Sequence, residues 1–388
     1  MPDAVSRMTN VLDTLGSLLL LVFGAFVLWI VVLYIIDVTQ TKHAIRRNFP
    51  VIGRLRYRFE HLGQFFRQYF YALDREEMPF NREQRSWVYR AAKGEDSAGA
   101  VGSTLQTDRV GTPMLVNSPY PVLDQDAEPI AAITVGPQCR EPFTTSSIFN
   151  VSAMSYGAIS KPAVRALSMG AAKAGIWLNT GEGGLSPFHL EGGADIVFQI
   201  GTAKYGVRDA EGRFDADKFR EVMANATVRM CEIKLAQGAK PGKGGILPGA
   251  KVSQQVSTIR GIAVGEDSIS PNRHPEISND EELLDFIALL RETGGKPVGI
   301  KIVVGNPGAF EALLRRITAR GVDSAPDFVT VDSGDGGTGA APLSLIDNMG
   351  LTIEQSLPSV VNLLEKHGLR ERVKVVASGK LINPVDVA

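Results

Sequence analysis

EIKLAQGAKPGKGGILPG, residues 232–249, contains a strand and the loop that follows it. Apolar residues at 231, 233 and 235 alternate with Glu232 and Lys234, which is the period of a strand. The chain then enters a stretch rich in glycine and proline that carries two further lysines. Glycine lets backbone N–H groups approach an anion or a flat ring, and lysine supplies charge. Because parallel α/β proteins place ligand chemistry at strand C-terminal ends, this stretch predicts a ligand site in such a fold.

Short apolar segments alternate with helical segments on both sides of this stretch. We expect strands at 148–154, 176–180, 196–200, 230–236, 298–304, 328–333 and 373–378. Helices are expected at 161–174, 216–226, 280–292, 308–320 and 353–367. This succession favours a (β/α)8 TIM barrel over residues 146–388, truncated before its eighth strand because the sequence stops where the seventh helix begins.

Composition excludes several classes of protein. The 388 residues are 44% apolar and 21% charged, which is too apolar for a disordered chain. A net charge of −1 argues against nucleic acid as a partner. Cys139 and Cys231 are too few for a metal site on their own and indicate a reducing compartment.

The N-terminal region has the pattern of a membrane anchor. Residues 14–36 lack any charge, and as a helix they would cover ~35 Å, enough to cross a bilayer core. Lys42, Arg46 and Arg47 follow, so the positive-inside rule predicts a single-pass anchor at 1–38. The N-terminus is then expected outside and the barrel on the cytoplasmic side. A cleaved signal peptide and a buried core helix fit the run's length and flanks less well.

Residues 39–145 are expected to form a helical extension and linker. Phe59, Leu62, Phe66 and Tyr69 fall at helical spacing. This helix could lie on anionic lipid or, as we expect, dock on the main domain. Residues 97–145 are rich in Gly, Pro, Thr and Ser, which predicts mostly extended chain.

Five motifs carry a family resemblance. They are SAMSYGAISKPA (152–163), LNTGEGG (178–184), the 232–249 stretch, ISP (269–271) and SGDGGTGAAP (333–342). In this order they resemble the FMN-binding synthase domain of glutamate synthases over residues 110–388. The N-terminal anchor and the absence of a glutaminase domain make the chain most similar to the stand-alone members of that family.

The resemblance implies an FMN site at the C-terminal ends of the strands. Lys301 corresponds to a lysine near flavin N1 and O2, where a cation stabilises the reduced ring. The alternative for this residue is a surface lysine. The other implied cofactor-binding residues are Met154, Ser155, Thr180, Gln199, Ser333, Gly336, Gly337, Gly379 and Lys380.

The resemblance also implies a substrate site beside the flavin. Lys240 and Arg260 match cations that grip the two carboxylates of 2-oxoglutarate. Lys234 and Gln237 are implied to polarise the keto or imino group. Glu182 is implied to relay protons or position ammonia, with a structural cap or salt bridge as its alternative.

The chain departs from the family pattern at three positions. Ile246 stands where the large enzymes have glutamine, Ala158 replaces a serine, and Lys243 replaces an acid. These changes predict a different or larger keto or imino acid. The family's iron–sulfur cysteines follow the eighth strand, so a cluster is expected only in a longer form that carries them.

The implied function is FMN-dependent reductive amination of 2-oxoglutarate or a related 2-keto acid, within the EC 1.4 class. Since the chain has neither a glutaminase cysteine nor a G-x-G-x-x-G fingerprint, electrons and ammonia are expected from separate partners. One alternative is 2-hydroxy acid oxidation, which needs a histidine base such as His189 or His274. His189 is expected to be a solvated loop residue. The other alternative is an inactive membrane-tethered scaffold.

Overall fold

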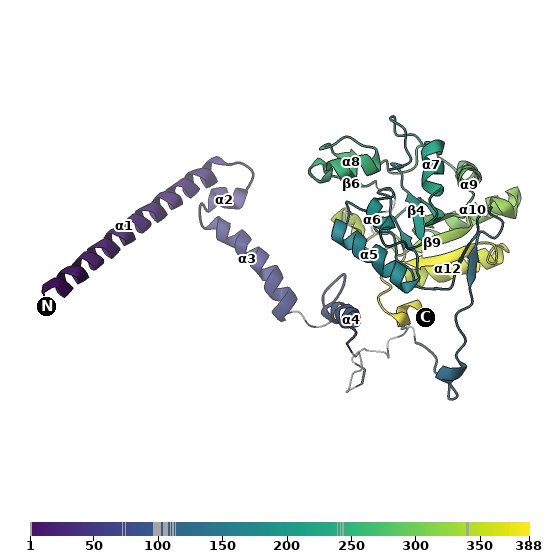
Figure 1. Ribbon diagram of the computed structural model, residues 1–388, viewed down its shortest axis with the longest axis horizontal. Coiled ribbons are helices and arrows are strands. Elements are labelled where there is room, and N and C mark those ends of the chain that lie inside the picture. The colour runs from purple at the N-terminus through teal and green to yellow at the C-terminus, as the bar shows by residue number, and fades with distance from the viewer. Residues whose placement is uncertain are drawn as a thin grey trace. The chain divides into compact units, whose positions relative to one another are not determined.

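The structure, a computed structural model, describes residues 2–388 except 72, 74, 96–101, 104–107, 109, 111, 113, 239, 241, 243, 339 and 340. Contacts divide the chain into two compact units, Met1–Gln106 and Thr107–Ala388 (Figure 1). Lys243, one of the three departures from the family pattern, lies outside the described residues.

The first unit is helical. Its elements are α1 (Pro2–Thr39), α2 (Ala44–Asn48), α3 (Gly53–Phe66), a π-helical turn η1 (Arg67–Tyr71) and α4 (Arg82–Lys93). Within α1, Leu12–Thr39 is long enough to cross a bilayer, and its most apolar window has a mean hydropathy of 3.0. None of its most apolar window is buried. The helix predicted from the spacing of Phe59, Leu62, Phe66 and Tyr69 is present as α3, and Tyr69 lies in η1.

The second unit is organised around a parallel sheet that curls on itself. Its strand order is β10-β9-β8-β5-β4-β3, and every pairing is parallel. The strands are β3 (Leu178–Asn179), β4 (Ile196–Ile200), β5 (Val228–Lys234), β8 (Val298–Ile302), β9 (Phe328–Asp332) and β10 (Lys374–Ser378). Val151 adds a parallel bridge to Leu178. The hydroxyls of Ser152 and Ser378 lie 3.0 Å apart, so the two ends of the sheet approach each other.

This architecture confirms the predicted barrel, incomplete at its eighth strand position within the described residues. All seven expected strand segments occur in order, the first of them reduced to the bridge at Val151. The five expected helices are α5 (Lys161–Ala174), α7 (Ala216–Met223), α9 (Asp280–Gly294), α10 (Pro307–Arg320) and α12 (Ile353–Lys366). Shorter elements are η2 (Asp124–Asp126), α6 (Pro187–Leu190), η4 (Val322–Ser324), α11 (Leu343–Ile346) and α13 (Pro384–Val387).

Strand alternation separates an apolar outer face from a polar interior. Ile196, Phe198 and Ile200 of β4 belong to the main core, which also contains residues of α5, α7 and α9. Val197 and Gln199 lie on the opposite face because successive side chains of a strand point to opposite sides. The interior side chains near the strand C-terminal ends are polar, which is where barrels hold their active sites.

A β-hairpin covers the other end of the strands. β1 (Ile133–Val135) pairs antiparallel with β2 (Phe143–Thr145). Val135 and Phe143 pack in a second core cluster with Val197, Met230 and Phe328. The sequence predicted only extended chain here, and the hairpin is an addition to that prediction.

The chain between β5 and α9 forms an excursion at the C-terminal ends of the strands. It contains β6 (Ile246–Leu247), η3 (Gly249–Lys251), α8 (Gln254–Arg260) and β7 (Ser268–Ile269), with β6 and β7 antiparallel. Leu247, Val252 and Val256 form its small core. This excursion carries the cations that the sequence assigned to substrate binding.

Candidate functional site

A buried carboxylate organises the middle of the barrel interior. Glu232 Oε1 accepts hydrogen bonds from Asn179 Nδ2 at 2.9 Å and Gln199 Nε2 at 2.6 Å. Its other oxygen accepts one from Thr330 Oγ1. These four residues come from β3, β4, β5 and β9, and all are buried. The network satisfies the carboxylate and fixes the side chain of Gln199, one of the predicted cofactor residues.

Lys301 lies in the same interior, one layer nearer the strand ends. It is 5% exposed, and its Nζ lies 3.4 Å from Asp332 Oδ1. The second oxygen of Asp332 accepts the backbone N–H of Gly238 at 2.7 Å. The surface alternative for Lys301 is therefore wrong, because the ammonium is buried beside a carboxylate.

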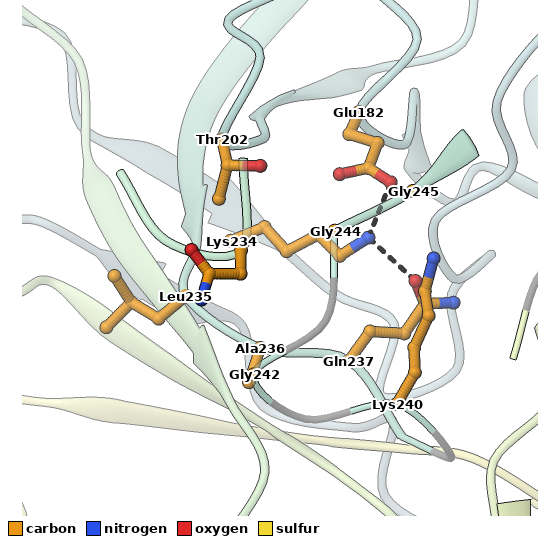
Figure 2. Close-up of a pocket in the computed structure, with 11 residues that line it drawn as sticks. Glu182, Thr202, Lys234, Leu235, Ala236, Gln237, Lys240, Gly242, Gly244 and Gly245 are labelled. Atoms are coloured by element: carbon orange, nitrogen blue, oxygen red, sulfur yellow. Dashed lines mark hydrogen bonds and ion pairs between the residues drawn. The ribbon is translucent and has the colours of Figure 1, made fainter. Parts of the chain in front are cut away.

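A pocket opens above this interior at the start of the 235–245 loop. Lys234 Nζ lies 3.0 Å from Glu182 Oε1 and donates to Gln237 Oε1 at 2.7 Å (Figure 2). Lys240, 5% exposed, lines the same pocket. The described lining residues are Glu182, Thr202, Lys234, Leu235, Ala236, Gln237, Lys240, Gly242, Gly244, Gly245 and Asn272. The structure thus brings all three predicted catalytic residues together with one predicted substrate cation.

The electrostatics of the pocket depend on this pair. Burial alone would raise the pKa of Glu182, but Lys234, Lys240 and Arg260 outweigh it and hold that pKa below its ordinary value. Burial lowers the pKa of Lys234, and Glu182 opposes that shift. Lys240 and Lys301 add to the lowering. The pocket therefore carries charged cations around one carboxylate, and an anionic ligand is electrostatically favoured there.

Arg260 lies beside the pocket rather than in its lining. Its Nη2 donates to the carbonyl of Tyr156 at 3.0 Å, and its guanidinium lies 4.9 Å from the centre of the Tyr205 ring. A Cβ at Gly157 or Gly183 would come within 3.0 or 3.1 Å of Nη2. The two glycines thus let both loops close onto the guanidinium. Lys240 and Arg260 were predicted to bind the two carboxylates of one substrate. In the structure Lys240 lines the pocket, whereas Arg260 lies against these loops.

The first loop of the site is held by a histidine. His189 is fully buried, and its Nε2 lies 2.8 Å from the carbonyl of Met154. Ser186 contacts Nδ1 through its hydroxyl at 2.8 Å and its N–H at 3.2 Å. The expectation of a solvated loop histidine was wrong, because α6 folds back beneath the 154–157 loop. The contact between His189 Nε2 and the Met154 carbonyl thus holds the loop that contains Met154 and Ser155.

The last predicted cofactor residues gather at the ends of β9 and β10. Ser333 N donates to Ser378 O, and Gly336 N donates to Ser333 O. At Gly379, φ is +102° and a Cβ would lie 2.7 Å from Ser333 Cβ, so glycine is required there. Gly337 follows in the same loop.

In this corner the Asp335 carboxylate contacts the polar side chains of Ser333 and Lys380. Lys380 Nζ lies 2.7 Å from Asp335 Oδ2, and the Ser333 hydroxyl donates to Asp335 Oδ1. Burial raises the pKa of Asp335, but these two partners outweigh it and lower that pKa. The corner therefore already accommodates an oxyanion, as a phosphate site must, and a phosphate bound there would compete with Asp335.

Several site residues have no counterpart among the predicted ones. Glu232, Asn179 and Thr330 form the interior network, and His189 anchors the first loop. The signal for Glu232 was present, since it shares a strand face with Lys234 two residues later. His189 had no such signal, because its burial depends on the packing of α6 against α5.

Two of the three positions that depart from the family pattern, Ile246 and Ala158, lie outside the pocket lining. Ile246 is 52% exposed in β6, next to Gly245 of the pocket lining, and Ala158 is exposed. Neither lines the pocket. Among the residues that the structure describes, no group of three His, Cys, Asp or Glu side chains is arranged to hold a metal ion.

Comparison with known proteins identifies the family of this chain. Residues 114–388 match the family described as "Conserved region in glutamate synthase". The chain is 40% identical over 398 residues to the glutamate synthase large subunit-like protein YerD of Bacillus subtilis, covering 92% of this chain and 74% of that protein. It is 38% identical to the archaeal-type glutamate synthase [NADPH] of Dehalococcoides mccartyi, covering 61% of this chain and 44% of that protein.

The chain therefore spans less than half of the archaeal-type relative but most of YerD. The family match begins at residue 114 and includes every predicted site residue, from Met154 to Lys380. On the extent of this match, and on the identity shared with YerD, the chain belongs to the glutamate synthase family.

Proposed function

We propose that this chain is an FMN-dependent oxidoreductase that reductively aminates a 2-keto acid, 2-oxoglutarate or a related one, to the amino acid. Family membership supports a glutamate synthase-type oxidoreductase. The observation that carries the proposal is the pocket in which Glu182, Lys234 and Lys240 meet at the strand C-terminal ends. Barrel enzymes hold their chemistry at this face.

The barrel interior fits a flavin. Lys301 of β8, Gln199 of β4 and Thr180 at the end of β3 present buried polar groups. The loop at Met154 and Ser155 is anchored by His189. Ser333, Gly336, Gly337, Gly379 and Lys380 form the anion-accommodating corner and would hold the phosphate. When bound, FMN accepts two electrons from a donor and returns them as a hydride.

The residues of the pocket account for the remaining needs of the reaction. A 2-keto acid and ammonia condense to a 2-imino acid with loss of water, and reduction adds a hydride to carbon and a proton to nitrogen. Lys240 binds the carboxylate, and the proton to be transferred is held by Lys234, whose Nζ lies 3.0 Å from Glu182 Oε1. The lowered pKa of Lys234 favours release of that proton. Electrons and ammonia come from separate partners.

Oxidation of a 2-hydroxy acid receives less support from the same site. That reaction needs a histidine base facing the substrate. His189 and His274 are both buried, and each has Nε2 on a backbone carbonyl, that of Met154 or Lys234. Neither lines the pocket.

The proposal extends to the location of the protein. We place α1 across a membrane, with the barrel on the cytoplasmic side, because Leu12–Thr39 is apolar and basic residues follow it. Reporter fusions test this placement. A cytoplasmic reporter after residue 388 should be active and a periplasmic one inactive, and the reverse result contradicts the orientation.

The activity is tested by reoxidation of the flavin. The purified chain in detergent, reduced chemically without oxygen, should be reoxidised only when a 2-keto acid and ammonia are both present. Lys240→Met should raise KM for the keto acid by roughly tenfold or more, the loss of one charge-assisted hydrogen bond. The matched control Lys251→Met changes an exposed lysine of η3 and should have no effect. A chain that binds no FMN, or that is reoxidised by keto acid alone, contradicts the proposal.

A further inference from the structure

The surface of α3 and its continuation η1 is amphipathic in a specific way. Leu55, Phe59, Leu62, Phe66 and Phe70 recur every three or four residues, so they form one stripe along the helix. Their exposed fractions run from 45% to 67%. The rings of Phe66 and Phe70 are 5.7 Å apart, which continues the stripe into the π-helical turn. We call these five residues the aromatic stripe.

Basic residues flank the aromatic stripe on both sides. At 100° per residue, Arg58 lies on one border of the apolar arc, and Arg56 and Arg67 lie on the other. The opposite face carries Tyr57 and Gln64. Arginine at the borders of an apolar face places its long stem on the apolar surface and its charge at headgroup level.

The region that follows α1, residues 40–71, is strongly basic as a whole. Between residues 40 and 71 the basic residues are Lys42, Arg46, Arg47, Arg54, Arg56, Arg58 and Arg67, and the only acidic one is Glu60. Such a segment next to a membrane span is attracted to anionic headgroups.

The start of α3 is tied to the end of α1. The Asp37 carboxylate, fully buried, accepts hydrogen bonds from Arg54 Nε and Nη2 at 2.8–3.0 Å. It also accepts the N–H of Val51 at 3.0 Å. Val51 has φ +67°, a strained conformation for a β-branched residue, and this contact helps to hold it. The helix therefore begins close to where the apolar span ends.

We infer that α3 and η1 lie in the membrane interface, with the aromatic stripe in the acyl boundary and its arginines on anionic lipid headgroups. This inference rests on the proposed membrane placement of α1. A soluble protein partner or the second unit, Thr107–Ala388, which we call the catalytic unit, would not require basic residues on both borders of the stripe, whereas an anionic surface would. The continuity with α1 places the stripe at the depth where aromatic side chains are favoured.

Spin labels test the inference on the full chain in nanodiscs containing phosphatidylglycerol. With Cys139 and Cys231 replaced by alanine, single cysteines are placed at 59 and 66 on the stripe, at 57 and 64 opposite, and at 23 within α1. Labels at 59 and 66 should collide more with oxygen than with a water-soluble nickel chelate. Labels at 57 and 64 should show the reverse preference.

The label at 23 separates the two proposals. If position 23 prefers oxygen but 59 and 66 do not, α1 spans the membrane and the interfacial placement of α3 is wrong. If position 23 also prefers nickel, the span itself is wrong. Labels at 59 and 66 that are shielded from both reagents show that protein covers the stripe, which also overturns the inference.

Paired substitutions supply the control. With the label at 62, Phe59→Glu with Phe66→Glu should abolish the preference for oxygen, whereas Tyr57→Glu with Gln64→Glu should leave it. In nanodiscs of phosphatidylcholine alone, the oxygen preference at 62 should fall at least twofold. An unchanged preference in that lipid would overturn the role assigned to the arginines.

Discussion

His189 links two loops of the site through both of its ring nitrogens. Because the N–H of Ser186 can only donate, Nδ1 must accept it, and the ring proton lies on Nε2, which donates to Met154 O. Burial lowers the pKa of His189, and the bond to Met154 opposes that shift. The imidazole is thus held neutral, and protonation at Nδ1 would break the contact with Ser186.

Replacing His189 should weaken cofactor binding. His189→Leu leaves the Met154 carbonyl buried without its donor, which costs ~1–3 kcal/mol and should weaken FMN affinity about tenfold. The control His367→Leu removes a 3.4 Å contact with Glu311 on α10, away from the site. Quenching of FMN fluorescence measures both affinities, and equal values would contradict the anchoring role.

The same residue predicts how stability changes with acidity. His189 binds its proton less readily in the folded chain than in the unfolded one, so the unfolded state gains protons first as pH falls. Stability should therefore be complete above the ordinary histidine pKa and decline between that value and the lowered one. Urea titrations across this range should show the decline in the native chain and a smaller one in His189→Leu.

Glu182 governs the proton affinity of its neighbour. The carboxylate favours the charged form of Lys234 against burial and the neighbouring lysines. Glu182→Gln removes that support, so the pKa of Lys234 should fall further. If Lys234 delivers the proton, the alkaline limb of the kcat profile should move to lower pH. A limb that stays in place would show that another group sets it.

Among the helices and strands, those with a clear local sequence pattern could be predicted from the sequence. The strands of the sheet were predictable because their apolar outer positions alternate with polar interior ones, as in 230–236. The β1–β2 hairpin was not, because strands of three residues carry too little pattern. Arg260 was assigned from the family resemblance, but its position beside Tyr156 depends on where α8 packs, which no local signal contains.

The hairpin end of the barrel depends on one buried carboxylate. Asp327 precedes β9 and accepts hydrogen bonds from Arg291 Nε at 3.1 Å and from the N–H of Val298 at 2.8 Å. It also forms an ion pair with Arg372, whose Nη1 lies 3.0 Å from Oδ1. Gln138 of the hairpin also donates to it. Asp327→Asn leaves two arginines facing a neutral amide and should cost ~3–5 kcal/mol of unfolding free energy.

Urea denaturation measures this cost against the control Asp323→Asn. Asp323 is exposed in η4, so its change should stay within about 0.5 kcal/mol. The burial of Cys139 beside Asp327 raises the pKa of its thiol to about 11, and the carboxylate adds to that shift. Asp327→Asn should therefore also increase the reactivity of Cys139 toward iodoacetamide at neutral pH. An unchanged midpoint would show that the cluster is dispensable.

At the scale of the whole molecule, stability and the proposed membrane attachment belong to different units. All described buried apolar side chains of the core belong to residues 135–373, whereas the first unit exposes its apolar residues. Removal of residues 2–106 should therefore release the catalytic unit from the membrane without altering its core. The thermal midpoint of the remaining unit should stay within about 2 °C of that of the full chain, as expected for a change outside the core. If α3 instead covered the catalytic unit with its aromatic stripe, the deletion would expose apolar surface on that unit, and the midpoint would fall by more. Calorimetry of both forms in the same detergent thus decides whether the stripe serves the membrane or the barrel.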